Sequence, residues 1–135
     1  MNKPQIEWIK DQDSSLALIV RADFDPPQTT FITPPEYVKQ IGFIVYPSGA
    51  EIPRHFHKLS KRSLQTTPEC LIVKKGKVEI TFYNLNRQEV CRRILYQGDL
   101  VLVLNCGHQF KFLEDTVLLE VKQGPYAGPC EKELF

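Results

Sequence analysis

The sequence predicts an all-β protein built from antiparallel strands in one domain. Short runs of alternating apolar and polar residues recur about every 8–12 residues, which is the spacing of strands in a sandwich or barrel. No window longer than about ten residues has the period of an amphipathic helix. The 135 residues, 42% of them hydrophobic, are enough to bury one sizeable core.

Eight or more strands are predicted, separated by residues that favour turns. In the clearest run Val78, Ile80 and Phe82 should face the core while the residues between them face solvent. Turns are expected at Gly76 and within 84–87, 96–99 and 113–116. The predicted strands lie within 16–24, 41–47, 69–75, 75–85, 89–96, 99–105, 108–114 and 116–123.

Two proline pairs, Pro26-Pro27 and Pro34-Pro35, mark the first third of the chain. Proline is confined to sheet edges and turns. We therefore expect residues 1–40 to form N-terminal strands or an arm that packs on the core or on a partner subunit, with 41–135 as the core of the one domain. Because such an arm can add to a neighbour's sheet, the sequence predicts a homodimer.

Charge and hydropathy exclude some partners. Seventeen basic and sixteen acidic residues give a formal charge of +1, and no basic block is dense enough to bind a row of phosphates. No apolar run is as long as a bilayer requires, and no export signal is recognisable, so we expect a soluble cytoplasmic protein. In a reducing compartment the cysteines should remain thiols; they are Cys70, Cys91, Cys106 and Cys130.

Histidine is rare in this chain, yet two of its three histidines, His55 and His57, stand two residues apart. On an extended strand both imidazoles would project from one face, and Phe56 would pack on the other. That arrangement suits a shared metal ion; the alternative is a chance pair of surface histidines.

Glu69 and His108 are the further candidate ligands. Glu69 begins the apolar run 69–75, and its parity with Leu71 and Val73 turns it inward, where a carboxylate must be paired, protonated or bound to metal. The alternative is a solvated glutamate at a strand end. His108 follows the apolar run 99–105 directly after Gly107 and would otherwise be a core or loop histidine.

These residues resemble the cupin superfamily, whose first motif is G-x5-H-x-H-x3or4-E-x6-G. Gly49, His55, His57, Glu69 and Gly76 follow it, except that eleven residues, 58–68, separate His57 from Glu69. The second motif, G-x5-P-x-G-x2-H, is matched loosely, with His108 ten residues after Gly98. Nearly the whole chain is similar to small single-domain bacterial cupins, some of which occur among sugar and surface-polysaccharide functions.

The resemblance implies an antiparallel jelly-roll barrel with one metal site. Three imidazoles and one carboxylate, from His55, His57, Glu69 and His108, suit a divalent transition metal ion: Fe, Mn, Ni, Co or Zn. The predicted function is to bind, or act on, a small oxygen-rich molecule such as a sugar derivative. The alternatives are a metal-free sugar-nucleotide ketoisomerase that uses His55 and His57 as acid and base, and a binding module without turnover.

Further residues are weaker candidates for contact with such a ligand, because a surface or packing role is the more common one for residues of these types. Glu120 and Lys122 interrupt an apolar strand on one face and are expected to point inward. The full set is Arg54, Arg62, Tyr83, Gln109, Phe110, Glu120 and Lys122.

Overall fold

The computed structural model describes residues 3–124, 128 and 132–135. All the regular secondary structure in these ranges is β-strand, and every strand pair is antiparallel. The all-β antiparallel prediction is therefore confirmed. The chain divides into two compact units: unit 1 comprises 1–24 and 66–135, and unit 2 comprises 25–65. The predicted arm, 1–40, therefore contributes strands to both units.

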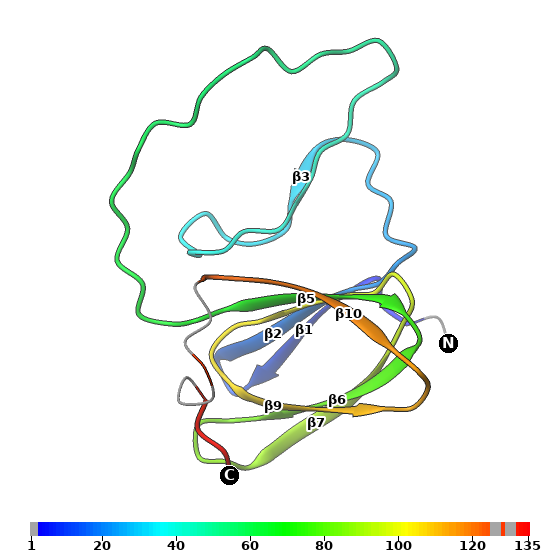
Figure 1. The fold of residues 1–135 in the computed structure, drawn as a ribbon, viewed down its shortest axis with the longest axis vertical. Helices are drawn as coiled ribbons and strands as arrows, with labels where there is room; N and C mark the ends of the chain where they lie inside the picture. The colour runs from blue at the N-terminus through cyan, green and yellow to red at the C-terminus, as the bar shows by residue number, and fades with distance from the viewer. Residues whose placement is uncertain (1–2, 125–127, 129–131) are drawn as a thin grey trace. The chain divides into compact units, whose positions relative to one another are not determined.

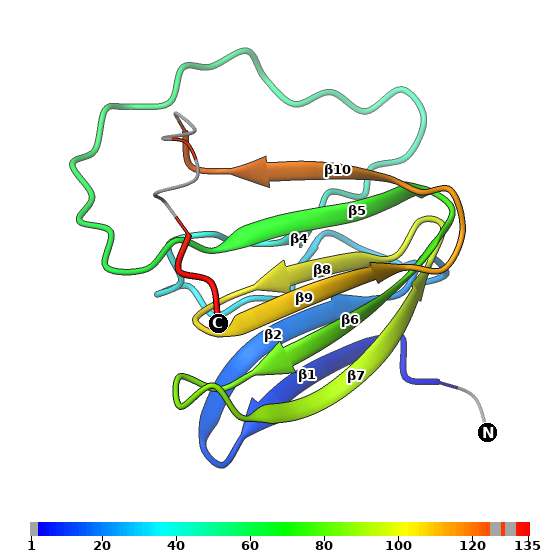
Figure 2. The ribbon, with the colours of Figure 1, turned by 60° about the horizontal axis from the view of Figure 1, so that its bottom comes forward.

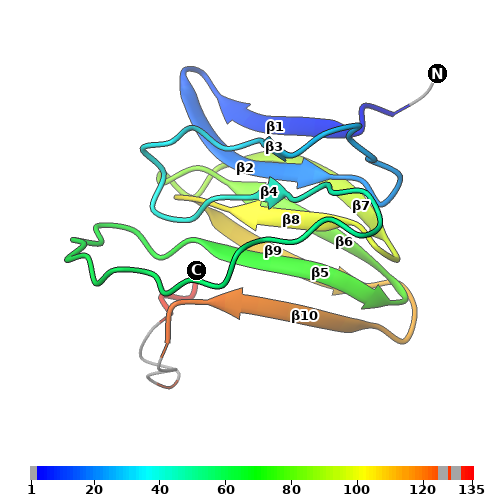
Figure 3. The same cartoon turned by 90° about the horizontal axis from the view of Figure 1, so that it is seen from above.

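Unit 1 contains a five-stranded sheet in the order β1-β2-β8-β5-β10 (Figure 3). It joins the start of the chain to strands that come much later in the sequence, and β1 and β10 are its edges. The bounds are β1 Ile6–Asp11, β2 Ser14–Val20, β8 Leu100–Val103, β5 Glu69–Lys75 and β10 Val117–Lys122.

The second sheet of unit 1 has three strands in the order β7-β6-β9, and it forms the other layer (Figure 1). Its strands are β7 Glu89–Tyr96, β6 Lys77–Tyr83 and β9 Gly107–Phe112. Gly76 turns the chain between β5 and β6 with a φ of 95°, as predicted, and a Cβ there would collide with the backbone of Asp115.

The core lies between these two sheets. Val78, Ile80 and Phe82 are fully buried, as their alternation predicted, although Thr81 on the opposite face is buried too. Because both sheets supply the same apolar cluster, unit 1 is a β-sandwich rather than one sheet closed on itself. The cluster comprises Ile9, Leu16, Ala17, Ile19, Leu71, Val73, Val78, Ile80, Phe82, Leu95, Val101 and Val103.

Both faces of the five-stranded sheet are apolar along its central strands. Ile19, Val101 and Leu71 lie side by side on the core face, while Leu18 and Leu102 lie opposite each other on the other face and are fully buried as well. Strands buried on both faces read as continuous apolar runs, which explains why 16–20 and 100–104 lack alternation.

A charged cluster closes one end of the sandwich. Asp99, at the turn before β8, is 2.9 Å from Arg21 Nη1; the Asp99 side chain is buried and that of Arg21 is 10% exposed. The Asp99 carboxylate also accepts hydrogen bonds from the backbone N–H groups of Ala22 and Tyr96, at 2.9 and 2.8 Å. Arg21 Nη1 donates to the Ile94 carbonyl at 2.8 Å. The cluster therefore links the end of β2, in the five-stranded sheet, to β7, in the three-stranded sheet.

Unit 2 contains little regular structure. Its strands are β3 Thr30–Phe31 and β4 Gly42–Phe43, and the predicted strand 41–47 is reduced to the latter. Residues 51–64 are not in a strand, and Phe56 is almost wholly exposed. The expectation that His55 and His57 share a strand with Phe56 packed on its far face was therefore wrong, because Pro47 and Pro53 interrupt this segment.

Within the described ranges, no helix has the length and apolar character needed to cross a membrane.

Candidate functional site

A pocket of about 500 Å³ lies in unit 1, where the edge strands of the two sheets leave the sandwich open. Its walls come from β5 and β10 on one side and from the start of β9 on the other, and Figure 2 shows β10 and β9 at the borders of their sheets. The lining residues are Glu69, Leu71, Cys106, Gly107, His108, Phe110, Leu118, Glu120, Lys132, Glu133, Leu134 and Phe135.

Strand register places the charged residues of the five-stranded sheet together. Lys122 is opposite Glu69, and Glu120 is opposite Leu71, so all four share the core face. Diagonal neighbours on adjacent strands lie within reach of long side chains. Glu69 therefore lies on the face of Leu71, as its parity predicted, and Lys122 Nζ lies 3.7 Å from a Glu120 oxygen.

The three-stranded sheet supplies the opposing wall. His108 lies opposite Phe82, and Phe110 lies opposite Ile80, so both follow the core-facing side of β6. Their rings are 5.7 Å apart at an interplanar angle of 76°. His108 thus reaches the same pocket as Glu69 from a different sheet, which local sequence spacing alone does not reveal.

The carboxyl group of Glu69 holds its proton more tightly than an ordinary glutamate. Burial is the largest cause that raises its pKa, and a hydrogen bond with Glu120 and the negative charge of Glu120 raise it further. The positive charges of Lys122 and Lys132 act in the opposite direction. Glu69 therefore favours its protonated form more than an exposed glutamate does, with Glu120 as its neighbouring acceptor.

His108 favours its neutral form. Burial lowers the pKa of its imidazole, and the charge of Lys132 lowers it further; the backbone of Cys106 and the charge of Glu120 act in the opposite direction. Its Nδ1 atom is buried and has no hydrogen-bond partner. A buried ring nitrogen without a partner is costly unless something else occupies it, and a neutral imidazole is the form that binds metals.

The predicted thiols are described only in part. Cys91 and Cys106 are free cysteines, and Cys130 lies outside the described residues. Cys106 lines the pocket and donates to the carbonyl of Leu16. Burial raises the pKa of its thiol to about 12, so it is a poor nucleophile.

The other two predicted ligands belong to unit 2. The rings of His55 and His57 are 5.2 Å apart at an angle of 65°, so they are neighbours even without a strand. His55 Nδ1 lies 2.7 Å from the Pro53 carbonyl, to which it can only donate, which leaves Nε2 as the free acceptor. The four predicted ligands thus form two pairs, one in each unit, and their convergence on one ion stays a prediction.

The weaker candidates separate in the same way. Phe110 and Glu120 line the pocket, whereas Arg54 and Arg62 are exposed in unit 2. Tyr83 and Gln109 border a neighbouring hollow of about 320 Å³, where the Tyr83 hydroxyl donates to Gln109 Oε1 at 3.3 Å.

Sequence reasoning missed part of the lining. Leu118 shares the parity of Glu120 and could have been found from it. The segment 132–135 has no periodicity and no strand, so no sequence signal indicated that it would reach the pocket. Among the residues that the structure describes, no three His, Cys, Asp or Glu side chains are grouped as a metal site.

These features define an antiparallel β-sandwich with a polar, partly buried pocket at one open end. No protein-family model, no curated protein and no solved structure matches the chain.

Proposed function

We propose that this pocket binds one divalent transition metal ion together with a small oxygen-rich molecule, such as a sugar derivative. One observation carries the proposal: Glu69 and His108, selected as ligands from the sequence, line the same pocket from different sheets, and His108 Nδ1 is buried without a partner. His55 and His57 would complete the ligand set, in the jelly-roll arrangement that the cupin resemblance implies.

The donor atoms suit such an ion. Neutral imidazole nitrogens with one carboxylate are typical ligands of Fe, Mn, Ni, Co and Zn in their divalent states. The hydrogen bond from His55 Nδ1 to a backbone carbonyl is the outer contact that orients a histidine for binding through Nε2. When bound, the ion would polarise an oxygen of the ligand or lower the pKa of a bound hydroxyl.

The remaining pocket residues would hold the organic molecule. Phe110 and Leu118 offer an apolar wall, and Glu120 can accept hydrogen bonds from hydroxyl groups. Lys122, within 4 Å of Glu120, keeps that carboxylate oriented. The cytoplasmic location and the homodimer predicted from the sequence belong to the same proposal.

Metal content is the direct test. Protein purified without chelators should contain close to one transition metal ion per chain by elemental analysis. His108→Ala and Glu69→Gln should each weaken binding by at least about tenfold, because each removes a ligand. Glu114→Gln, which changes an exposed carboxylate outside the pocket, is the control and should keep its metal.

Two outcomes would count against the metal proposal: wild-type protein without bound metal, or ligand variants that bind it as well as the control does. Retention of metal by the double variant His55→Ala/His57→Ala would remove unit 2 from the site and leave the pocket of unit 1 as the whole binding site.

A metal-free acid–base site is the second candidate, and the carboxyl pair supports it. Glu69, with its raised pKa and its hydrogen bond to Glu120, is a proton donor beside the neutral base His108. The sequence suggested a ketoisomerase that uses His55 and His57 instead. Stoichiometric metal in the purified protein would argue against both versions. A third candidate, a binding module, predicts a large rise in the unfolding midpoint on adding metal, with no turnover.

A further inference from the structure

The residues Glu133, Leu134 and Phe135, here called the cover, separate two hollows in unit 1. All three line the pocket of about 500 Å³ that contains Glu69 and His108. They also line the hollow of about 320 Å³ that contains Tyr83 and Gln109. His108 borders both hollows, so the cover is a wall between two parts of one cavity system.

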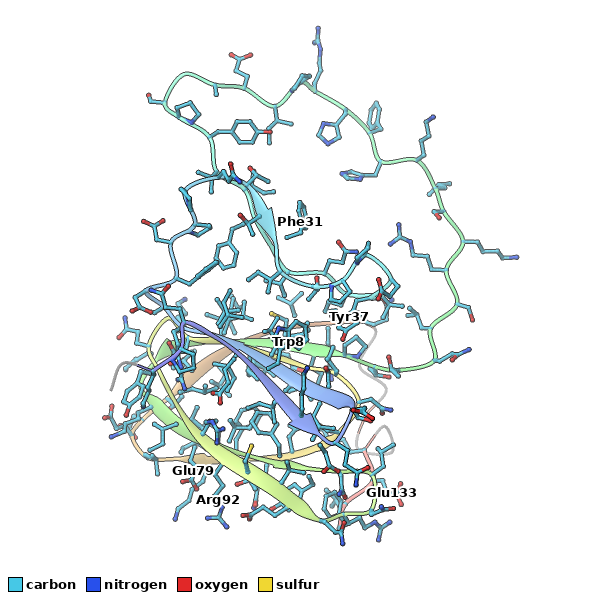
Figure 4. All side chains as sticks on the ribbon, turned by 180° about the vertical axis from the view of Figure 1, so that it is seen from behind. Trp8, Phe31, Tyr37, Glu79, Arg92 and Glu133 are labelled. Carbon is cyan, nitrogen blue, oxygen red and sulfur yellow. The ribbon has the colours of Figure 1, made fainter. Side chains whose placement is uncertain are left out.

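The cover contacts side chains of β6 and of the turn between β6 and β7, and it lies against Gly107 of β9. Glu133 lies beside that turn (Figure 4), with an oxygen 2.7 Å from Arg87 Nη2. The Phe135 ring meets the Tyr83 ring edge-on, with centroids 5.2 Å apart, and the Arg87 guanidinium lies 5.7 Å from the Phe135 centroid. Gly107 makes room for this ring, because a Cβ there would come within 2.8 Å of Phe135.

Arg87 has an unfavourable backbone for its residue type. Its φ is 64°, in the left-handed region that glycine or asparagine adopts most easily. The hairpin itself is maintained by backbone hydrogen bonds between Asn84 and Gln88 and from Arg87 to Asn84, which any residue could make. An arginine at this position is therefore not explained by the turn, whereas its two contacts with the cover give its side chain a role.

These contacts are strong enough to position the cover and weak enough to release it. The side chains of Arg87 and Glu133 are 58% and 83% exposed, and exposed ion pairs contribute little because water competes for both partners. An edge-on aromatic pair adds a similarly modest amount. The cover and His108 line both hollows together, and the Nδ1 atom of His108 is buried.

We propose that the cover is displaceable, and that its departure joins the two hollows into one site for an elongated ligand with an acidic group. One end of the ligand would lie near Glu69, His108 and Glu120. Its carboxylate or phosphate would take the place of Glu133 at Arg87, beside Tyr83 and Gln109. The proposal concerns access to the pocket and holds whether or not the pocket binds a metal.

Chemical modification of His108 reports directly on the cover. Diethyl pyrocarbonate acylates neutral, accessible imidazoles, and peptide mass spectrometry gives a rate for each histidine separately. The full chain would be used after dialysis against a chelator, so that no bound metal protects a histidine. Wild-type protein should react slowly at His108 and fast at the exposed His55 and His57, which act as internal controls.

Three variants release the cover in different ways. Arg87→Gly removes the cation and relieves the turn, Phe135→Ala removes the ring, and Gly107→Ala pushes the ring away without altering the ion pair. Each should raise the His108 rate by about fivefold or more, the factor expected when a contact of this strength is lost. The rates at His55 and His57 should not change, nor should Glu114→Gln alter any of the three.

Exchanging the two charges tests whether the ion pair itself positions the cover. Arg87→Glu should raise the His108 rate, and Arg87→Glu/Glu133→Arg should restore it. For the acidic ligand group, inorganic phosphate should speed modification of wild-type His108 more than sodium chloride of equal ionic strength, and should have no such effect in Arg87→Gly. Equal His108 modification rates in wild-type protein and in all three release variants would overturn the proposal that the cover limits access to His108. Equal effects of phosphate and chloride would overturn the role of Arg87 as an anion site.

Discussion

The two ends of the sandwich in unit 1 both contain buried charge, but they use it differently. At the end formed by Arg21 and Asp99, three hydrogen-bond donors reach the one carboxylate, although Arg21 Nε is buried without a partner. At the other end, burial and then the neighbouring Glu120 raise the pKa of Glu69, and His108 Nδ1 has no partner. A carboxylate that receives three donors is a structural device, whereas a carboxyl group with a raised pKa in a pocket is characteristic of a binding site.

The largest loss of stability is expected at the end that contains Arg21 and Asp99. Asp99→Ala leaves the Arg21 cation buried without its partner and leaves the N–H groups of Ala22 and Tyr96 without an acceptor. Breaking a buried ion pair in this way costs about 3–5 kcal/mol. Urea unfolding followed by tryptophan fluorescence would measure the loss of stability. A loss below about 1 kcal/mol, as for a surface pair, would show that the two ends do not differ as described.

At the pocket, removing the charged group should stabilise the folded protein instead of destabilising it. The pKa of Glu69 is raised in the folded protein, so between its unfolded and folded values the folded state binds more protons than the unfolded state. The free energy of unfolding therefore decreases as the pH rises through that interval. Glu69→Gln should remove this decrease and stabilise the metal-free protein at mildly alkaline pH by about 1 kcal/mol or less, because the carboxyl group is partly solvated and water screens its interactions.

Urea unfolding in the presence of a chelator, at several pH values on both sides of the ordinary glutamate pKa, would measure this effect. Glu114→Gln serves as the matched control, since its carboxylate is exposed. If Glu69→Gln destabilised the protein at every pH, the carboxylate would be a structural group like Asp99.

A smaller loss of stability is expected for a surface ion pair that joins the two sheets. Arg93 of β7 donates to both carboxylate oxygens of Glu7 of β1, at 2.8–3.0 Å, but both side chains are partly solvated. Arg93→Ala should cost about 1 kcal/mol, near the upper limit for such pairs. Double-mutant cycles with Glu7→Ala would isolate the pair from its neighbours; a coupling as large as that of Arg21 with Asp99 would contradict the distinction by burial.

The smallest effect is expected for Arg92. It lies 2.8 Å from Glu89 and 3.7 Å from Glu79, and Figure 4 shows Arg92 and Glu79 projecting to the same side. Because the Arg92 side chain is largely exposed, water replaces both contacts. Arg92→Ala should leave the unfolding midpoint unchanged within error, with any small difference disappearing at high salt.

Strands were predictable where apolar residues dominate or alternate. The runs 69–75 and 89–96 coincide with β5 and β7, and parity placed Glu69 on the face of Leu71. β1 was missed because Glu7, Lys10 and Asp11 break its apolar pattern, while its core contribution rests mainly on Ile9.

The candidate site was only half predictable, since a pocket joins residues that no sequence pattern links. Glu69 and His108 could be selected because a charged or titratable residue stands beside an apolar strand. The contribution of Glu133 and Phe135 depends on contacts with Arg87 and Tyr83, about fifty residues earlier, and has no local signature. For His55 and His57, the period-two argument assumed a strand that the neighbouring prolines do not allow.

The apolar character of both faces of β2 and β8 has a consequence for how the chain selects one alignment. A one-residue slip normally moves apolar side chains into water, and this penalty specifies the pairing. Between 16–20 and 100–103 a slip would exchange one apolar face for another, so the penalty is nearly absent. Arg21 and Asp99, just beyond the paired residues, can meet in only one alignment. Their ion pair therefore selects the register in which β2 and β8 are paired.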